Sequence, residues 1–285
     1  MTLGGLLENI IADVIFLTGI TICATVLLAT TRWRTQARLL RFLGLQTDKP
    51  LLVVFFSTLV VRQGGSTGFD GVRRTYSGPA VPEAEWKEGQ IVSRALEVPG
   101  RGLLARLLMT AIRRIPWDRV RDWLGPQEVE IQYELSYLQV PAPLPAAVTI
   151  CLGSPGYNYA TDVYLSTLSP LLTFSGGPNP DIRDESGNPV THDGDVGMLQ
   201  RLRRDDGLPV YIAAGLGTNG TRGALQRLFT AWRDLEKRFG TGDFALALGF
   251  PWFRDDPFGS QRPVELLALS RQTGAVASLQ DHQCG

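Results

Sequence analysis

One stretch of the chain decides the fold that the sequence predicts: residues 208–240 read LPVYIAAGLGTNGTRGALQRLFTAWRDLEKRFG. Residues 208–215 are mostly apolar, as in a buried strand, and the glycines that follow predict a tight turn. Large apolar side chains then recur at helical spacing up to Phe239, and Gly240 is placed to end the helix. They are Leu225, Leu228, Phe229, Trp232, Leu235 and Phe239. The stretch therefore predicts a strand, a turn and a helix over residues 221–239.

Similar strand signals occur on both sides of this stretch. Residues 51–61, LLVVFFSTLVV, form a continuous apolar run that is typical of a strand covered on both faces. Further strands are expected at 128–137, 146–153, 171–177 and 243–250, and helices from Glu83 onward and at 103–112, 117–125 and 159–168. Strands that alternate with helices predict an α/β domain with a Rossmann-like, mostly parallel sheet and helices on both faces. We expect this domain to span residues 51–272, and residues 273–285 to form a flexible tail.

The N-terminal segment predicts a membrane anchor. Residues 14–30, VIFLTGITICATVLLAT, carry no charge and would extend about 25 Å as a helix, near the lower limit for crossing the hydrocarbon core. We therefore expect residues 1–31 to be a transmembrane anchor that contacts the bilayer through residues 10–31. A buried helix of a soluble protein and a cleaved signal peptide are the weaker alternatives.

The charges beside this segment predict its orientation. Residues 1–9 contain no Lys or Arg, whereas four arginines follow the apolar run: Arg32, Arg34, Arg38 and Arg41. The positive-inside rule then places the N-terminus outside and the domain in the cytoplasm, as in a single-pass protein of the cell inner membrane. Residues 32–50 are expected to form a basic juxtamembrane linker, with Trp33 in the interfacial belt.

Three glycine-bearing loops are predicted to leave strands at the same edge of the sheet. They are GGSTGFDG at 64–71, GSPGYN at 153–158 and GLGTNGT at 215–221. Ligands of open α/β sheets usually bind at the carboxyl ends of the strands. The predicted ligand-binding residues are Gly153, Ser154, Gly156, Asn158, Gly215, Gly217, Asn219, Gly220 and Thr221.

The last loop resembles the dinucleotide-binding fingerprint G-x-G-x-x-G, because Gly215, Gly217 and Gly220 follow a predicted strand and precede a predicted helix. The resemblance implies that backbone N–H groups at the start of the helix bind an anion. No acidic residue ends the next predicted strand, which argues against a classical NAD site. A phosphate, carboxylate or ribose is the expected ligand group, and a turn without a ligand is the alternative.

An acidic segment at residues 176–197 is expected to form a solvated rim or lid above this edge. Asp193 and Asp195 within it, together with Glu85, are the weak candidates for a catalytic acid or base. Residues 201–204, RLRR, are explained equally by a phosphate clamp and by a solvent-facing helix end. The carboxylate spacing fits no known calcium motif, so no metal site is predicted, and the cofactor is left open.

Composition excludes several classes of protein. The chain carries 28 basic and 28 acidic side chains, and this zero net charge argues against a nucleic-acid partner. Cys23, Cys151 and Cys284 form no disulfide framework, and only two histidines are present, so His-based zinc sites and Ser-His-Asp triads are difficult to build.

Together these features predict a membrane-anchored cytosolic domain that binds a nucleotide or another small phosphorylated ligand, as a sensor or effector. The first alternative is a nucleotide or nucleoside hydrolase or transferase that uses a loop carboxylate. The second is a membrane-tethered protein-interaction module. A homo-oligomer remains open, and the enzyme question is undecided at this point.

Overall fold

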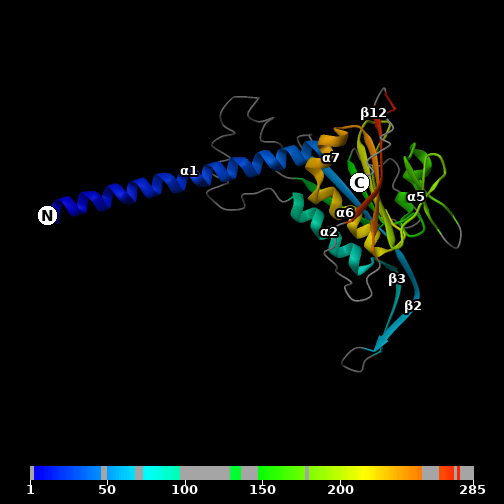
Figure 1. Ribbon diagram of the computed structural model, residues 1–285. Coiled ribbons are helices and arrows are strands. Elements are labelled where there is room, and N and C mark those ends of the chain that lie inside the picture. Colours follow the sequence, from blue (N-terminus) through cyan, green and yellow to red (C-terminus); the bar gives the residue numbers. More distant parts are fainter. Residues whose placement is uncertain are drawn as a thin grey trace.

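The computed structural model joins one long helix to a mixed α/β body (Figure 1). It describes residues 3–45, 50–67, 73–96, 129–135, 147–176, 180–251, 263–272 and 275–276. The expected helices at 103–112 and 117–125 lie outside these residues, as does all of the expected tail except the two-residue strand Ala275–Val276.

Eight strands form the main sheet. In order across the sheet they are β13 (Ala275–Val276), β12 (Val264–Gln272), β11 (Asp243–Phe250), β9 (Asp195–Arg203), β10 (Pro209–Gly215), β5 (Val148–Leu152), β1 (Leu51–Phe56) and β4 (Glu130–Leu135). The neighbours from β4 to β10 are parallel, and those from β10 to β13 are antiparallel. The α/β class is confirmed, but the sheet is mixed, and the Rossmann-like, mostly parallel arrangement is not confirmed.

The departure from a parallel sheet begins at β9. This strand lies next to β10 and joins it by a tight turn in which Gly207 has a φ of +81° and Arg204 N donates to Leu208 O. A turn this short can only reverse the chain, so β9 runs antiparallel to β10. The prediction for residues 201–204 is therefore wrong as a helix end, because Arg201–Arg203 end β9.

Different elements cover the two faces of the sheet (Figure 1). One face packs against α5 (Tyr159–Thr167) and a small sheet of β6 (Leu172–Phe174), β7 (Ile182–Asp184) and β8 (Pro189–Val190). The other packs against the end of α1 (Leu3–Leu43), α2 (Glu83–Leu96), α6 (Thr218–Thr230) and α7 (Trp232–Phe239). Helices on both faces are thus confirmed. The strand expected at 171–177 belongs to the small sheet, and the acidic segment contributes β7 and β8.

Two predicted elements are divided in the structure. The helix expected over 221–239 is α6 followed by α7, separated at Ala231, and Gly240 is the C-cap of α7 as predicted. The apolar run at 51–61 contains the whole of β1, which is the second strand from one edge of the sheet, then two residues outside any strand, and the start of β2 (Leu59–Thr67). β2 pairs with β3 (Arg73–Ala80) in a hairpin that extends away from the body (Figure 1).

The long helix α1 has two chemically different halves. The segment Val14–Leu43 is long and apolar enough to cross a membrane by length and composition, and the 18-residue window that gives this result has a mean hydropathy of 2.1 and lies in the first half. Large apolar side chains such as Ile15, Phe16 and Leu28 are exposed, and this half projects from the body (Figure 1). The last three turns are packed into the core through the side chains of Trp33, Ala37, Leu39, Leu40, Phe42 and Leu43. The residues expected to form a linker therefore include a buried part of the domain, and Trp33 is only 2% exposed because it packs on protein.

Candidate functional site

The carboxyl ends of β1, β5 and β10 meet at one edge of the sheet, because these strands are parallel neighbours. Antiparallel β9 begins at the same edge. The loops after β5 and β10 therefore lie where the sequence predicted them. Of the loop expected at 64–71, residues 64–67 belong to the projecting β2 and do not join this edge (Figure 1), and residues 68–71 lie outside the described residues.

Glu85 is held between the ends of β1 and β5. Its Oε2 accepts a hydrogen bond from Ser57 N at 2.8 Å, and Ser57 Oγ donates to Leu152 O at 3.1 Å. Gly153 has a φ of +102°, and a Cβ there would collide with Ser57 Oγ and come within 3.1 Å of Glu85 Oε1. Only glycine fits this close approach, which brings the Glu85 carboxylate against both strand ends.

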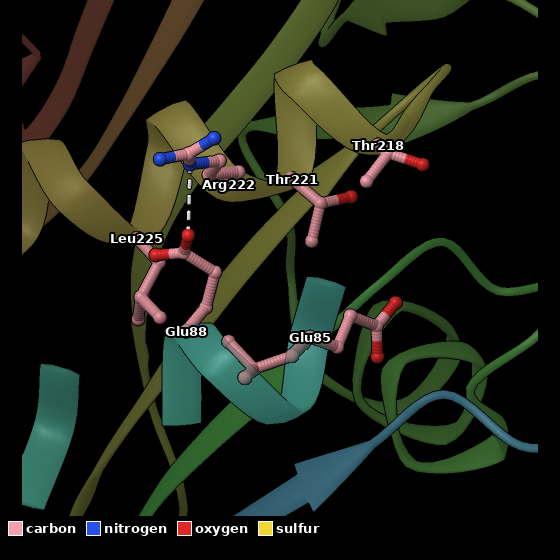
Figure 2. Close-up of a pocket in the computed structure, with 7 residues that line it drawn as sticks. Glu85, Glu88, Thr218, Thr221, Arg222 and Leu225 are labelled. Atoms are coloured by element: carbon pink, nitrogen blue, oxygen red, sulfur yellow. Dashed lines mark ion pairs between the residues drawn. The ribbon is translucent and has the colours of Figure 1, made fainter. Parts of the chain in front are cut away.

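A recess opens beside Glu85, between α2 and α6 (Figure 2). It is small and open to solvent, with a cavity volume of about 10 Å³. Its lining residues are Glu85, Glu88, Leu152, Thr218, Thr221, Arg222 and Leu225. Figure 2 shows Glu88 on α2 facing Arg222 on α6, and the ion pair between them joins Glu88 Oε1 to Arg222 Nε at 2.8 Å. The recess thus combines two carboxylates, one guanidinium and two hydroxyls.

One carboxylate oxygen in this recess lacks a partner. Glu88 is 7% exposed, and its Oε2 is buried without a hydrogen-bond partner among the described residues. Burial raises the pKa of Glu88, although the charge of Arg222 and a hydrogen-bonding interaction with the Gln226 side chain act in the opposite direction. Burial likewise raises the pKa of Glu85 above its ordinary value, against the hydrogen bonds from Ser57. Both groups therefore hold a proton more readily than exposed glutamates do.

The start of α6 is occupied by a carboxylate of the chain itself. Asp195 is 2% exposed, and its two carboxylate oxygens accept hydrogen bonds from Gly217 N at 2.8 Å and Gly220 N at 2.6 Å. Burial raises the pKa of Asp195, and these amides oppose the shift. The resemblance to the dinucleotide fingerprint implied that these N–H groups bind an external anion. In the structure they cap α6 through Asp195, which satisfies the same helix dipole.

The remaining predicted residues fall into separate environments. Asn158 is fully buried and caps α5, since its Oδ1 accepts from Thr161 N and its Nδ2 donates to Phe55 O and Leu152 O. Ser154 and Asn219 are half-buried, while Gly156 and Asp193 are exposed. A Cβ at Gly215 would meet the backbone of Thr221, so Gly215 is required for packing. Of the predicted ligand residues, Thr221 lines the recess, as does the catalytic candidate Glu85.

Sequence reasoning missed Glu88, Arg222 and Thr218. The signal for Glu88 was its spacing: residues three apart on a helix share one face, so Glu85 and Glu88 both point toward the sheet edge. Arg222 lies in the first turns of the helix that follows the glycine loop. Its pairing with Glu88 depends on the contact of α6 with α2, which no local pattern indicates.

The surroundings of the site define the class of the protein. In the described ranges, no group of three or more His, Cys, Asp or Glu side chains could hold a metal ion. Comparison of the chain with protein-family models, curated proteins and solved structures gave no match. Fold and site alone define a mixed α/β domain with an acidic recess at the carboxyl edge of its parallel strands, joined to a helix long and apolar enough to cross a membrane.

Proposed function

We propose that this chain is a single-pass membrane protein whose cytosolic α/β domain binds a nucleotide or another small phosphorylated ligand and acts as a sensor. The observation that carries the proposal is the buried, unpartnered Oε2 of Glu88 in the recess beside Arg222. A buried acceptor without a donor costs roughly 1–3 kcal/mol of stability. A ligand that places an N–H or O–H group on this oxygen would remove that cost.

A nucleotide offers the two kinds of group that the recess can bind. Its amino or hydroxyl groups donate to Glu88 and Glu85, and its phosphate accepts from the guanidinium of Arg222 and the exposed hydroxyl of Thr218. Because Asp195 holds the amides at the start of α6, the phosphate is proposed to sit beside these amides and not on them.

Contacts on the helical face support transmission from the recess to the membrane. Arg222 and Leu225 line the recess from α6, which leads directly into α7. Trp232 at the start of α7 contacts Phe42 of α1 at 6.5 Å between ring centroids, and Arg38 Nε lies 2.6 Å from Glu236 Oε2. A ligand that orders α6 would therefore affect the position of α1 through α7. The arginines after the apolar run support an external N-terminus in the cell inner membrane.

The test is calorimetry on the full chain in neutral-lipid nanodiscs with a panel of mono-, di- and cyclic nucleotides. We expect at least one to bind, and Glu88→Gln to weaken it about ten-fold, equivalent to about 1.4 kcal/mol. The matched control is Asp162→Asn, which neutralises an exposed carboxylate on α5 at the other face and should leave affinity unchanged. If the folded protein bound none of the nucleotides in the panel, nucleotide binding would be refuted.

One observation favours an enzyme as the second candidate. Glu85 and Glu88 both have raised pKa values through burial, and such carboxyls serve as general acids in hydrolysis and group transfer. An enzyme would release product from the bound nucleotide, and Glu85→Gln would abolish turnover while binding persists. Binding without turnover would favour the sensor.

A further inference from the structure

The α/β body contacts α1 immediately after the charge-free run at residues 14–30. Arg233 Nη2 at the start of α7 lies 3.3 Å from Thr35 Oγ1, and Gln36 Nε2 donates to Ala95 O at the end of α2 at 3.2 Å. Gln36 is six residues beyond Thr30, which ends the charge-free run, or about 9 Å along the helix. The ends of α2 and α7 therefore lie at the height of the lipid headgroups if α1 spans the bilayer.

Three exposed arginines from three different helices lie at this height. Arg32 precedes the two contacts on α1, Arg94 is next to Ala95, and Arg233 makes the contact with Thr35 itself. We call Arg32, Arg94 and Arg233 the arginine collar. Among the described residues no carboxylate forms an ion pair with any of them. The Arg233 guanidinium is instead 4.9 Å from the ring centroid of Trp232.

Nearby acidic groups are already paired with other cations. Asp234 forms ion pairs with Arg227 and Arg238, and Glu236 pairs with Arg38. Within the part of the chain that the structure describes, the positive charge of the collar therefore remains available to an external anion. Exposed arginines beside an apolar span match the phosphate groups of lipids in geometry and in charge.

We infer that the arginine collar is a binding surface for the headgroups of anionic lipids, so that the α2 and α7 ends of the domain rest on the membrane. This inference depends on the part of the proposed function that places α1 across the bilayer, and it is independent of nucleotide binding. Two of the three collar residues belong to the soluble body. The collar thus couples the orientation of the domain to the charge of the bilayer, beyond what the arginines of α1 achieve alone.

The experiment uses the full chain reconstituted in phosphatidylcholine bilayers with spin-labelled phosphatidylglycerol or phosphatidylcholine as probe. It measures the association constant of each probe with the protein at low and high salt. We expect a preference for phosphatidylglycerol that weakens at high salt, because exposed charges are screened. The double variant R94Q/R233Q, which leaves α1 intact, should lower this preference about five-fold or more, as expected for lost contacts between arginine and an anionic surface.

The matched control is R183Q/R271Q, which removes the same charge near the small sheet on the other face. An equal loss of preference in this control would overturn the inference, since it would show that net charge alone attracts the lipid. An unchanged preference in R94Q/R233Q would overturn it as well. Extraction of the protein by alkaline carbonate would show that α1 does not span the bilayer and would remove the basis of the collar, whereas failure of every nucleotide to bind would leave it intact.

Discussion

The two edges of the sheet differ in whether their buried charged groups are fully hydrogen-bonded. At the edge where β10 begins, Arg201 is 3% exposed, and its guanidinium donates to the carbonyls of Phe42, Gly240 and Gly242. At the edge where β10 ends, Glu88 is buried to a similar degree but has one oxygen without a partner among the described residues. The first edge holds the end of α1, and the second contains the recess.

The edge where β10 begins, which we call the saturated edge because its buried charge is fully hydrogen-bonded, connects the end of α1 to the sheet. The rings of Phe42 and Phe244 lie 5.2 Å and 5.0 Å from the Arg201 guanidinium, and Tyr211 Oη donates to Phe42 O at 2.9 Å. Arg201 and Tyr211 thus both donate to the Phe42 carbonyl, one of the last four carbonyls of α1, which have no partner within the helix. The chain can therefore satisfy a buried charge completely, as it does at Arg201. Glu88 Oε2 is one of six buried side-chain atoms without a hydrogen-bond partner among the described residues, and of these six it alone belongs to a carboxylate. It is therefore a candidate acceptor for a ligand.

The largest expected effect comes from removing the end of α1. A chain that begins at residue 46 lacks six large apolar side chains of the core: Trp33, Leu39, Leu40, Phe42, Leu43 and Leu45. Since each such loss costs about 2–5 kcal/mol and a domain has about 5–15 kcal/mol in total, we expect this fragment to be unfolded. A chain that begins at residue 30 keeps these side chains and should fold. Circular dichroism and thermal melting would measure the folding of both chains. A cooperative transition in the chain that begins at residue 46 would show that the end of α1 is dispensable.

The second prediction compares the two edges by single substitutions. Arg201→Met leaves several buried carbonyls without donors and should lower the free energy of unfolding by about 3–5 kcal/mol. Glu88→Gln removes a charge whose burial is only partly compensated, and its partner Arg222 is partly exposed. We therefore expect the free energy of unfolding to change by no more than about 1 kcal/mol at pH 7. Urea unfolding of both variants would measure this contrast. Arg183→Met, which removes an exposed guanidinium, controls for loss of charge, and an equal cost at both edges would contradict the comparison.

The sequence predicted the local units of the fold correctly. β5, α5, β10 and β11 lie within two residues of their expected bounds, because apolar runs, glycine turns and caps are local signals. It failed at β9, where Gln200 and Arg201 made a central strand look polar. Gln200 is fully buried, accepts from Leu171 N and Leu172 N, and donates to Leu172 O. Side chains satisfied by distant partners cannot be recognised from neighbours in the sequence.

The site was predictable to a similar extent. Glu85 and Thr221 were named from their positions at a helix start and a glycine loop, and both line the recess. The Glu88–Arg222 pair requires contact between α2 and α6, which are more than a hundred residues apart. The occupation of the α6 amides by Asp195 depends on the antiparallel course of β9, which places the start of that strand beside α6. Both features follow from topology, which the sequence pattern did not determine.

The smallest expected effect is a dependence of stability on pH that originates at the recess. Burial raises the pKa of Glu85 and Glu88 in the folded protein above the ordinary value of 4.5. From pH 4.5 up to the raised values, the folded state binds more protons at these groups than the unfolded state does. Their contribution to stability is therefore present at low pH and is lost as pH rises through this window.

The double variant E85Q/E88Q should flatten this part of the profile. We expect the difference in free energy of unfolding between variant and wild type to grow in favour of the variant as pH rises from 4.5 to 7, because only the wild type loses the protons that stabilise its folded state. Urea unfolding at several pH values measures it, and Asp162→Asn serves as the exposed control. A difference that stays constant with pH would mean that the two pKa values are unshifted, and one that grows in favour of the wild type would mean that both carboxylates are stabilised as charges. The open edge would then resemble the saturated one, and the argument for a ligand at Glu88 would lose its physical basis.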